Sequence, residues 1–163
     1  MIAVDTNLLV YANREDSPWH SAAVRCLESL AESAAPWAIP WPCVHEFLAV
    51  VTHPRVFNPP TALEIALAAV DAWTQSPSVV LLGEAPGYWV TFRRLAESTK
   101  IVGPRVHDAR IAAICMQNGV EVFWTADRDF GRFGALRVRN PLIDPAGEVR
   151  ERRQRYGRRR LAR

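Results

Sequence analysis

Short apolar runs alternate along the chain with longer stretches in which apolar residues recur at helical spacing. A short apolar run bounded by turn residues favours a buried β-strand. Strands are therefore predicted at Ile2–Asp5, Ala38-Ile39, Ser78–Leu82, Val122–Trp124 and Leu136–Val138.

The stretches between these runs predict helices. Thr6, Ser17 and Thr61 are expected to be N-caps, with Pro18 at the first helical position behind Ser17. The predicted helices run from Thr6 to about Asn13, onward from Pro18, from Pro42 to about Thr52, and over Ala62–Gln75, Gly87–Thr99 and Val106–Gln117. Strands that alternate with helices indicate an α/β domain with a mainly parallel sheet.

Composition narrows the class of protein. With 163 residues, 49% of them hydrophobic, the chain suits one globular domain. Its apolar runs are shorter than the roughly 20 residues that span a bilayer, and no basic segment precedes the first of them. The three cysteines, Cys26, Cys43 and Cys115, are far apart and odd in number. Reduced thiols in a cytoplasmic protein without a membrane segment are therefore expected.

Charge is distributed unevenly. The segment Arg150–Arg163 holds eight arginines and one glutamate, a net charge of +7, so the other 149 residues sum to 3 − 7 = −4. Residues 146–163 are therefore interpreted as a flexible basic tail behind an acidic domain, residues 1–145. Binding of a polyanion and simple solubilisation both remain open for this tail. Its candidate contacts to nucleic acid are Arg152, Arg153, Arg158, Arg159 and Arg160.

Four carboxylates from separate parts of the sequence carry the candidate chemistry. Asp5 ends the first strand, Asp127 follows the strand Val122–Trp124, Asp108 lies in the first turn of a helix, and Glu46 lies in the helix after the second strand. Functional groups of open parallel sheets gather beyond the carboxyl ends of the strands. We therefore expect the four acids to converge.

Each acid also has a plain structural reading. Asp5 and Asp127 suit helix caps or turns, and the helix dipole favours Asp108 near an N-terminus whatever else it does. Glu46 projects away from the main apolar stripe of its helix, which suits a solvated glutamate. Cys43 and Val50 nevertheless flank it, and a carboxylate among apolar neighbours needs a cation or a hydrogen-bond donor.

Oxygen ligands point to one kind of cation. Carboxylates without histidine or cysteine partners suit Mg²⁺ or Mn²⁺, which can stabilise charge on a phosphodiester under attack by water. The set therefore predicts metal-assisted hydrolysis of a nucleic-acid backbone. Supporting candidates are Thr6, Asn7 and Thr125 as positioning groups, Asp129 as a further ligand or a turn residue, Arg128 and Arg132 as nucleic-acid contacts, and Phe130 as a core residue.

The segments VDTNLLVYA, HEF, HDARIAA and TADRDFGRF, in this order and spacing, resemble the PIN-domain endoribonucleases, specifically VapC-type toxins of bacterial toxin–antitoxin pairs. The resemblance covers most of residues 1–145. It implies a three-layer α/β/α fold and a Mg²⁺- or Mn²⁺-binding quartet of Asp5, Glu46, Asp108 and Asp127, with Asp5 and Asp108 as direct ligands. It further implies cleavage of RNA, a homodimer, and neutralisation by a VapB-type antitoxin.

Three other classes of protein fit the sequence less well. A catalytically inactive PIN-like module that binds RNA or protein would be favoured by loss of one acid, but all four are present. A phosphatase of the haloacid dehalogenase type requires Asp-x-Asp, whereas Asp5 is followed by Thr6 and Asn7. A receiver domain requires a late lysine, and the only lysine, Lys100, is poorly placed for that role.

Overall fold

The strands pair in parallel in the computed structural model, which describes residues 1–143. Their bounds are Ile2–Val4 (β1), Trp37–Pro40 (β2), Val79–Leu82 (β3), Val122–Trp124 (β4) and Val138–Arg139 (β5). They form one five-stranded sheet in the order β3-β2-β1-β4-β5, which places β1 at its centre. The predicted parallel sheet is thus confirmed, and its central strand is the one that Asp5 follows.

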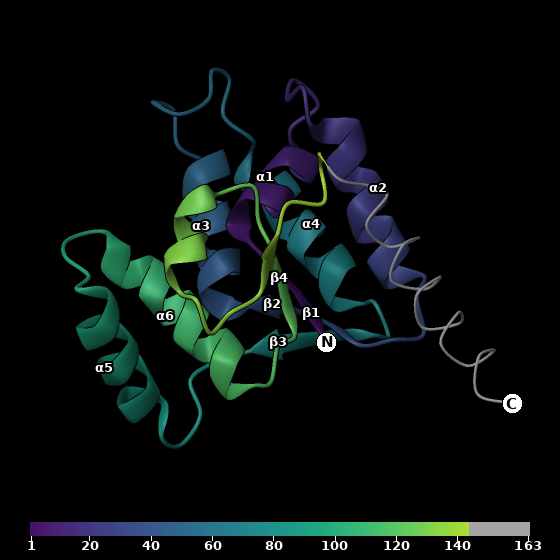
Figure 1. Ribbon diagram of the computed structural model, residues 1–163. Coiled ribbons are helices and arrows are strands. Elements are labelled where there is room, and N and C mark those ends of the chain that lie inside the picture. The colour runs from purple at the N-terminus through teal and green to yellow at the C-terminus, as the bar shows by residue number, and fades with distance from the viewer. Residues whose placement is uncertain (144–163) are drawn as a thin grey trace, which may run out of the picture.

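Helices cover both faces of this sheet. Their bounds are Thr6–Asn13 (α1), His20–Ala31 (α2), Trp41–Val51 (α3), Leu63–Thr74 (α4), Tyr88–Thr99 (α5) and Arg105–Gln117 (α6), with a short 3₁₀ helix at Arg128–Arg132 (η1). Helices α5 and α6 lie on one side of the sheet and α2 and α4 on the other (Figure 1). The fold is therefore the expected three-layer α/β/α arrangement.

Burial explains why the central strands are apolar on both sides. Ala3, Val4, Ala38, Ile39 and Phe123 are fully buried, with relative exposures of 0%. A parallel strand covered by helices on both faces has no solvent side to which a polar residue could be assigned. The first polar side chains of β1 and β4 therefore come directly after the strands, at their carboxyl ends.

Three predicted N-caps are wrong. Asp5, not Thr6, caps α1, and its side chain accepts a hydrogen bond from the Thr6 N–H. Helix α2 begins at His20, since the Ser17 hydroxyl accepts the Trp19 N–H in a turn that precedes the helix. Helix α4 is preceded by Ala62, and the Thr61 hydroxyl donates instead to Asn13. In each case a nearby contact used the polar group that local propensity had assigned to a cap.

Other differences are small. Helices α3 and α6 begin one residue before their predicted starts at Pro42 and Val106, and β5 is displaced towards Arg139 from the predicted Leu136–Val138. Helix α6 ends at Gln117, with Asn118 as its C-cap and Gly119 at a φ of 67° behind it. Phe130 is 2% exposed and packs against Phe123 and Phe133, which confirms its core assignment.

The described residues include all three cysteines and the helices α1 to α6. Cys26, Cys43 and Cys115 are free of disulfides. Over residues 1–143, no helix has both the length and the apolar character that crossing a membrane requires. The proposed domain boundary at 145/146 and the tail arginines lie outside the described residues.

Candidate catalytic and metal site at the sheet edge

Asp5 lies at the carboxyl end of the central strand and is almost completely buried, with 4% of its surface exposed. Its backbone N–H donates to the Trp124 carbonyl at 2.9 Å, which continues the pairing of β1 with β4 by one residue. Its carboxylate oxygen Oδ1 accepts the Thr6 N–H at 2.8 Å. The strand and the helix that follows it therefore fix this carboxylate from both sides.

The second oxygen of Asp5 is held by neutral side chains. Oδ2 accepts from Asn7 Nδ2 at 2.6 Å and from Thr125 Oγ1 at 2.5 Å. The Cys43 thiol lies 3.8 Å from Oδ1. All of these donors are uncharged, so they orient the carboxylate without neutralising it.

Thr6 connects Asp5 to Glu46. While its N–H donates to Asp5, its hydroxyl donates to Glu46 Oε2 at 2.6 Å. Glu46 remains exposed to solvent although Cys43 and Phe47 on the same helix are buried. This hydroxyl is the donor that a carboxylate among apolar neighbours was expected to need.

Asn7 and Thr125 hold the turn that carries Asp127. Asn7 Oδ1 accepts the Ala126 N–H at 3.0 Å, and Thr125 Oγ1 accepts the Asp127 N–H at 2.9 Å. The same two side chains donate to Asp5, so the turn after β4 is tied directly to the end of β1. Asp127 also caps η1, with its Oδ1 accepting the Asp129 N–H at 2.8 Å.

Asp129 and Arg132 form a pair inside this turn. The Arg132 guanidinium lies 3.1 Å from the Asp129 carboxylate and donates to the Asp129 carbonyl at 2.9 Å. The charge of Arg132 also offsets part of the increase in the pKa of Asp108 that desolvation causes. Asp129 and Arg132 thus pair with each other in the turn after β4, whereas Arg128 is exposed.

Electrostatics show that the four acids share one region. Burial raises the pKa of Asp5 to about 7, with smaller increases from the charges of Glu46 and Asp127, while the hydrogen bonds from Thr125 and Thr6 lower it. The pKa of half-buried Asp108 is raised by desolvation first, then by the charges of Asp127 and Glu46. Asp5 and Asp108 each therefore interact with the other two carboxylates.

The acids nevertheless do not form a closed coordination sphere. Among residues 1–143, no three side chains of histidine, cysteine, aspartate or glutamate are close enough to hold a metal ion as they stand. The donor chemistry fits Mg²⁺ or Mn²⁺, since the converging groups offer carboxylate oxygens and their mutual repulsion favours a cation between them. Asp5 is held at both carboxylate oxygens, whereas Glu46 and Asp127 are exposed and accept hydrogen bonds at Oε2 and Oδ1 respectively.

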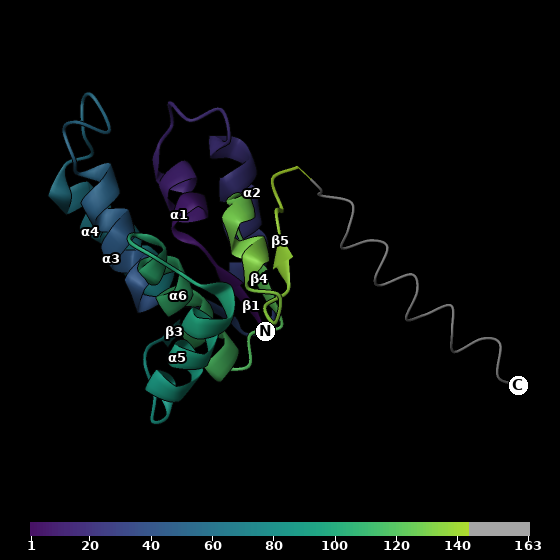
Figure 2. The same ribbon diagram turned by 60° about the vertical axis from the view of Figure 1, so that its left-hand side comes forward.

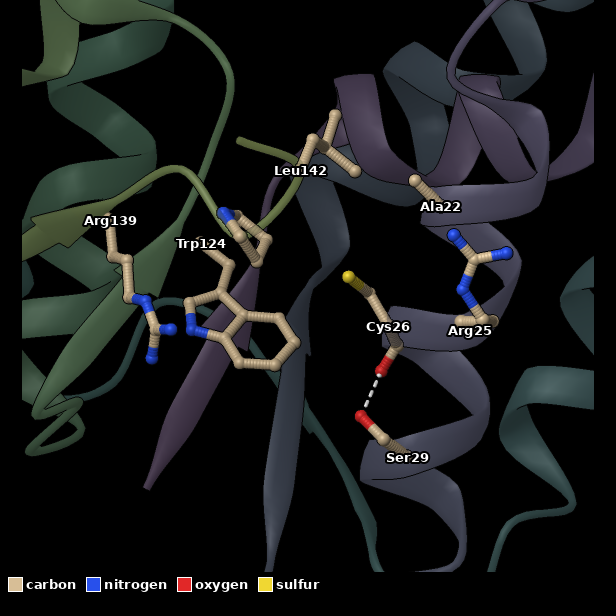
Figure 3. Close-up of a pocket in the computed structure, with 8 residues that line it drawn as sticks. Ala22, Arg25, Cys26, Ser29, Trp124, Arg139 and Leu142 are labelled. Carbon is tan, nitrogen blue, oxygen red and sulfur yellow. Dashed lines mark hydrogen bonds between the residues drawn. The ribbon is translucent and has the colours of Figure 1, made fainter. Parts of the chain in front are cut away.

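Two cavities lie away from this site. One, of about 200 Å³, lies between α2 and the last two strands, and its lining residues include Arg25, Cys26, Trp124 and Arg139 (Figure 3). Another, of about 390 Å³, lies between the end of α1, α2 and α4. None of the four acids lines either cavity.

Sequence reasoning did not identify Cys43 as a neighbour of Asp5. The thiol is fully buried, and desolvation followed by the Asp5 charge raises its pKa well above the usual range. The Cys43 thiol is therefore an uncharged neighbour of the Asp5 carboxylate. Its place three residues before Glu46, on the adjoining helical turn, was the one available signal.

Proteins of one family resemble this chain over most of its length. The sequence profile of the PIN domain family matches residues 2–136. Ribonuclease VapC43 of Mycobacterium tuberculosis is 39% identical over 142 residues, which cover 87% of this chain and 96% of that protein. Ribonuclease VapC48 of the same organism is 35% identical over 138 residues, which cover 85% and 95% of the two proteins.

Solved structures share the fold at lower sequence identity. VapBC2 from Rickettsia felis, bound to a DNA fragment of its promoter, matches with a TM-score of 0.64 and 19% identity over 86% of this chain and 98% of that one. VapC20 of Mycobacterium tuberculosis, a toxin that cleaves the sarcin–ricin loop, matches with a TM-score of 0.63 and 18% identity over 86% and 100% of the two chains.

Proposed function

The chain belongs to the PIN domain family, and we propose that it is an endoribonuclease of the VapC type that hydrolyses RNA phosphodiester bonds with Mg²⁺ or Mn²⁺. One observation carries the proposal. Asp5, Glu46, Asp108 and Asp127 come from four segments and meet at one sheet edge, where burial and mutual repulsion raise the pKa of Asp5 and Asp108. Carboxylates arranged in this way favour a divalent cation.

The four acids would hold the cation between them. When bound, it would supply positive charge to the phosphodiester oxygens and lower the pKa of a water molecule. Asp5 contributes a carboxylate whose position is fixed by Thr6, Asn7 and Thr125. Glu46, exposed and held at Oε2 by Thr6, is placed to accept a proton from the attacking water.

Asp108 and Asp127 complete the set from the other side. Asp127 is exposed, and Asn7 and Thr125 anchor its turn to the end of β1. The backbone of Asp127 is therefore held close to Asp5. The positive charge of Arg132 offsets part of the repulsion that Asp127 and Glu46 exert on the Asp108 carboxylate. The chain thereby combines one rigid carboxylate with three that are reachable from solvent.

The biological role follows from the same family. VapC43 and VapC48 are named as ribonucleases, and VapBC2 from Rickettsia felis and VapBC-1 from Haemophilus influenzae were solved as VapBC proteins. We propose that this chain acts in the cytoplasm as the toxin of a type II pair, as a homodimer that a VapB-type antitoxin neutralises. Co-purification with the product of a small adjoining reading frame tests the antitoxin.

The activity is tested with end-labelled RNAs incubated with purified protein, with and without Mg²⁺ or Mn²⁺. The wild-type protein should cut and the Asp5→Asn variant should not, and a chelator should stop the wild-type reaction. Equal cutting by both proteins would mean that a contaminant is responsible. Absence of cutting by the wild type on a broad RNA panel would favour the inactive binding module.

A further inference from the structure

The segment Thr52–Ala62, between α3 and α4, is held in one shape by the far end of α1. Arg14 donates from Nη1 to the Pro59 carbonyl at 3.0 Å and to Thr61 Oγ1 at 3.4 Å. Its guanidinium carbon also lies 4.2 Å from the centre of the Phe57 ring. A single side chain therefore fixes three points of this segment, which we call the Arg14 loop.

Arg14 is itself fixed. Its Nε and Nη2 donate to the two carboxylate oxygens of Asp16 at 2.9 and 2.6 Å, and only 12% of the side chain is exposed. Thr61 adds a second link from the loop to α1 through its hydroxyl, which donates to Asn13 Oδ1 at 3.2 Å. Arg14 is thus engaged internally and acts as a positioning residue.

Inside the loop, His53 organises the tip. Its carbonyl accepts the N–H groups of Val56 and Phe57, and its Nδ1 accepts the Arg55 N–H at 3.0 Å. The side chains of Arg55 and Asn58 are left exposed, and Val56 is 54% exposed. Between Thr52 and Ala62 the sequence contains no acidic residue. The loop therefore presents a cation, an amide and an apolar group to solvent and carries no acidic side chain of its own.

The loop stands close to the acids along two helices. Thr52 follows Glu46 by six residues of α3, about 9 Å at the helical rise, and Arg14 follows Thr6 by eight residues along α1, about 12 Å. The loop projects from the end of α3 that lies away from the sheet (Figures 1 and 2). About three nucleotides of a stacked strand, at 3.4 Å each, would cover this separation.

Charge gives the reason for a contact here. A polynucleotide brought to four carboxylates is repelled by them along its length, wherever a cation does not intervene. A substrate strand therefore gains from a positive side chain placed a few nucleotides beyond the acids, and Arg55 provides one on a preformed support. Little conformational entropy is lost when a strand binds a loop that is already ordered.

We propose that the Arg14 loop binds the RNA strand beside the scissile phosphate, with Arg55 contacting a backbone phosphate and Asn58 facing a base edge. The inference rests on the proposed ribonuclease function and names the substrate contacts of that site. Arg14 contributes by holding the loop, while the acids at the other end of α1 perform the chemistry.

The test uses steady-state cleavage of one single-stranded oligoribonucleotide, chosen from a random-sequence pool because the wild-type protein cuts it. Arg55→Ala should raise KM about threefold to tenfold and leave kcat unchanged. The slope of log(kcat/KM) against log salt should become shallower by about 0.7, the value of one phosphate contact on a single strand. Arg25→Ala on α2, which removes the same charge from another exposed arginine, should change neither quantity.

Arg14→Ala separates positioning from general destabilisation. At a temperature where the variant is folded, it should raise KM with kcat retained, and the Arg14→Ala/Arg55→Ala double variant should be no worse than the more affected single variant. Additive effects would show that Arg14 does not act through the loop.

The outcomes distinguish the two proposals. If the wild-type protein cuts RNA and Asp5→Asn does not, but Arg55→Ala matches Arg25→Ala, the loop inference is wrong and the ribonuclease function stands. Weakened antitoxin binding by Arg55→Ala with an unchanged KM for RNA would also overturn it, in favour of a protein contact. If the wild-type protein cuts no RNA, both the ribonuclease function and the RNA contact of the Arg14 loop are wrong.

Discussion

The two ends of α1 carry dense polar networks of opposite electrostatic character. At the first end, the Asp5 carboxylate is buried, receives only neutral donors and faces Glu46 and Asp127, and its pKa rises to about 7. At the last end, Arg14 meets Asp16, and the hydrogen bond from Arg14 holds the pKa of Asp16 below its usual value. One end leaves charge uncompensated and the other neutralises it.

The difference separates a reactive site from a support. Hydrogen bonds from neutral groups fix the direction of a carboxylate but leave its charge available to a cation. An ion pair within one short segment cancels charge and leaves only geometry, which here is the shape of the loop after α3. The same helix therefore offers both chemistry and rigidity, at ends about 12 Å apart.

Asp5→Asn should have the largest effect of the substitutions that test this difference between the two ends of α1. Removal of the buried negative charge should reduce RNA cleavage on the order of a thousandfold, because stabilisation of transition-state charge by the metal depends on it. The measurement is single-turnover cleavage, with circular dichroism to verify the fold. Asp71→Asn, an exposed aspartate on α4, is the matched control and should retain full activity. Equal losses in both variants would contradict the assignment.

The pH dependence of stability is the next test. Because the folded state raises the pKa of Asp5 from 3.8 to about 7, it binds the proton more tightly than the unfolded chain does. The stability of metal-free protein should therefore fall as the pH rises from about 4 to about 7, by on the order of a few kcal/mol. The raised pKa of Asp108 acts in the same direction.

Urea unfolding in the presence of a chelator at several pH values measures this trend. The Asp5→Asn variant should lose most of the dependence, and Mg²⁺ should stabilise the wild type more at pH 8 than at pH 5. A wild-type protein whose stability relative to Asp5→Asn rises with pH over this range would show that the Asp5 charge is compensated after all.

Arg14→Ala tests the neutralised end. The loss of the hydrogen bonds to Pro59 and Thr61 and of the contact with Phe57 should lower the free energy of unfolding by about 2 kcal/mol. Arg93→Ala, which breaks an exposed ion pair with Glu97 on α5, should cause no measurable loss. Similar urea midpoints for the two variants would mean that Arg14 does not hold the loop.

The smallest expected effect is that of Thr6→Val. This substitution keeps the shape and the N–H that Asp5 accepts, and removes only the hydroxyl that donates to Glu46. We expect kcat to fall about tenfold, as for other groups that orient a metal-site ligand, while Thr6→Ser restores it. A Thr6→Val variant with wild-type kcat would show that Glu46 needs no such orientation.

The sequence was sufficient to predict the parallel sheet. Strands buried on both faces must be apolar, so the runs at Ile2–Val4 and Val122–Trp124 could be recognised without any partner. The positions of Asp5 and Asp127 could be predicted as well, because the polar residues of such strands are confined to the strand ends. The parallel sheet and the grouping of the acids were predictable for this reason.

Local capping rules failed where another contact used the polar side chain of the predicted cap. Thr61 has the side chain of an N-cap, but its hydroxyl donates to Asn13, 48 residues earlier in the chain. Ser17 and Pro18 form a turn before α2 instead of its start. Capping propensities are worth about 1 kcal/mol, so one tertiary contact is enough to override them.

The strands, the helices and the acids that follow β1 and β4 could be predicted from the sequence, because apolar runs and helical spacing are local properties of the chain. How Asp5 and Glu46 are held depends on packing, since Thr125 donates to Asp5 from 120 residues away and Thr6 donates to Glu46 from 40 residues away. The same is true of the loop after α3, where Arg14 donates to Pro59 from 45 residues away. No sequence spacing encodes such pairs, since a hydrogen bond depends on positions that exist only after the sheet and helices have packed.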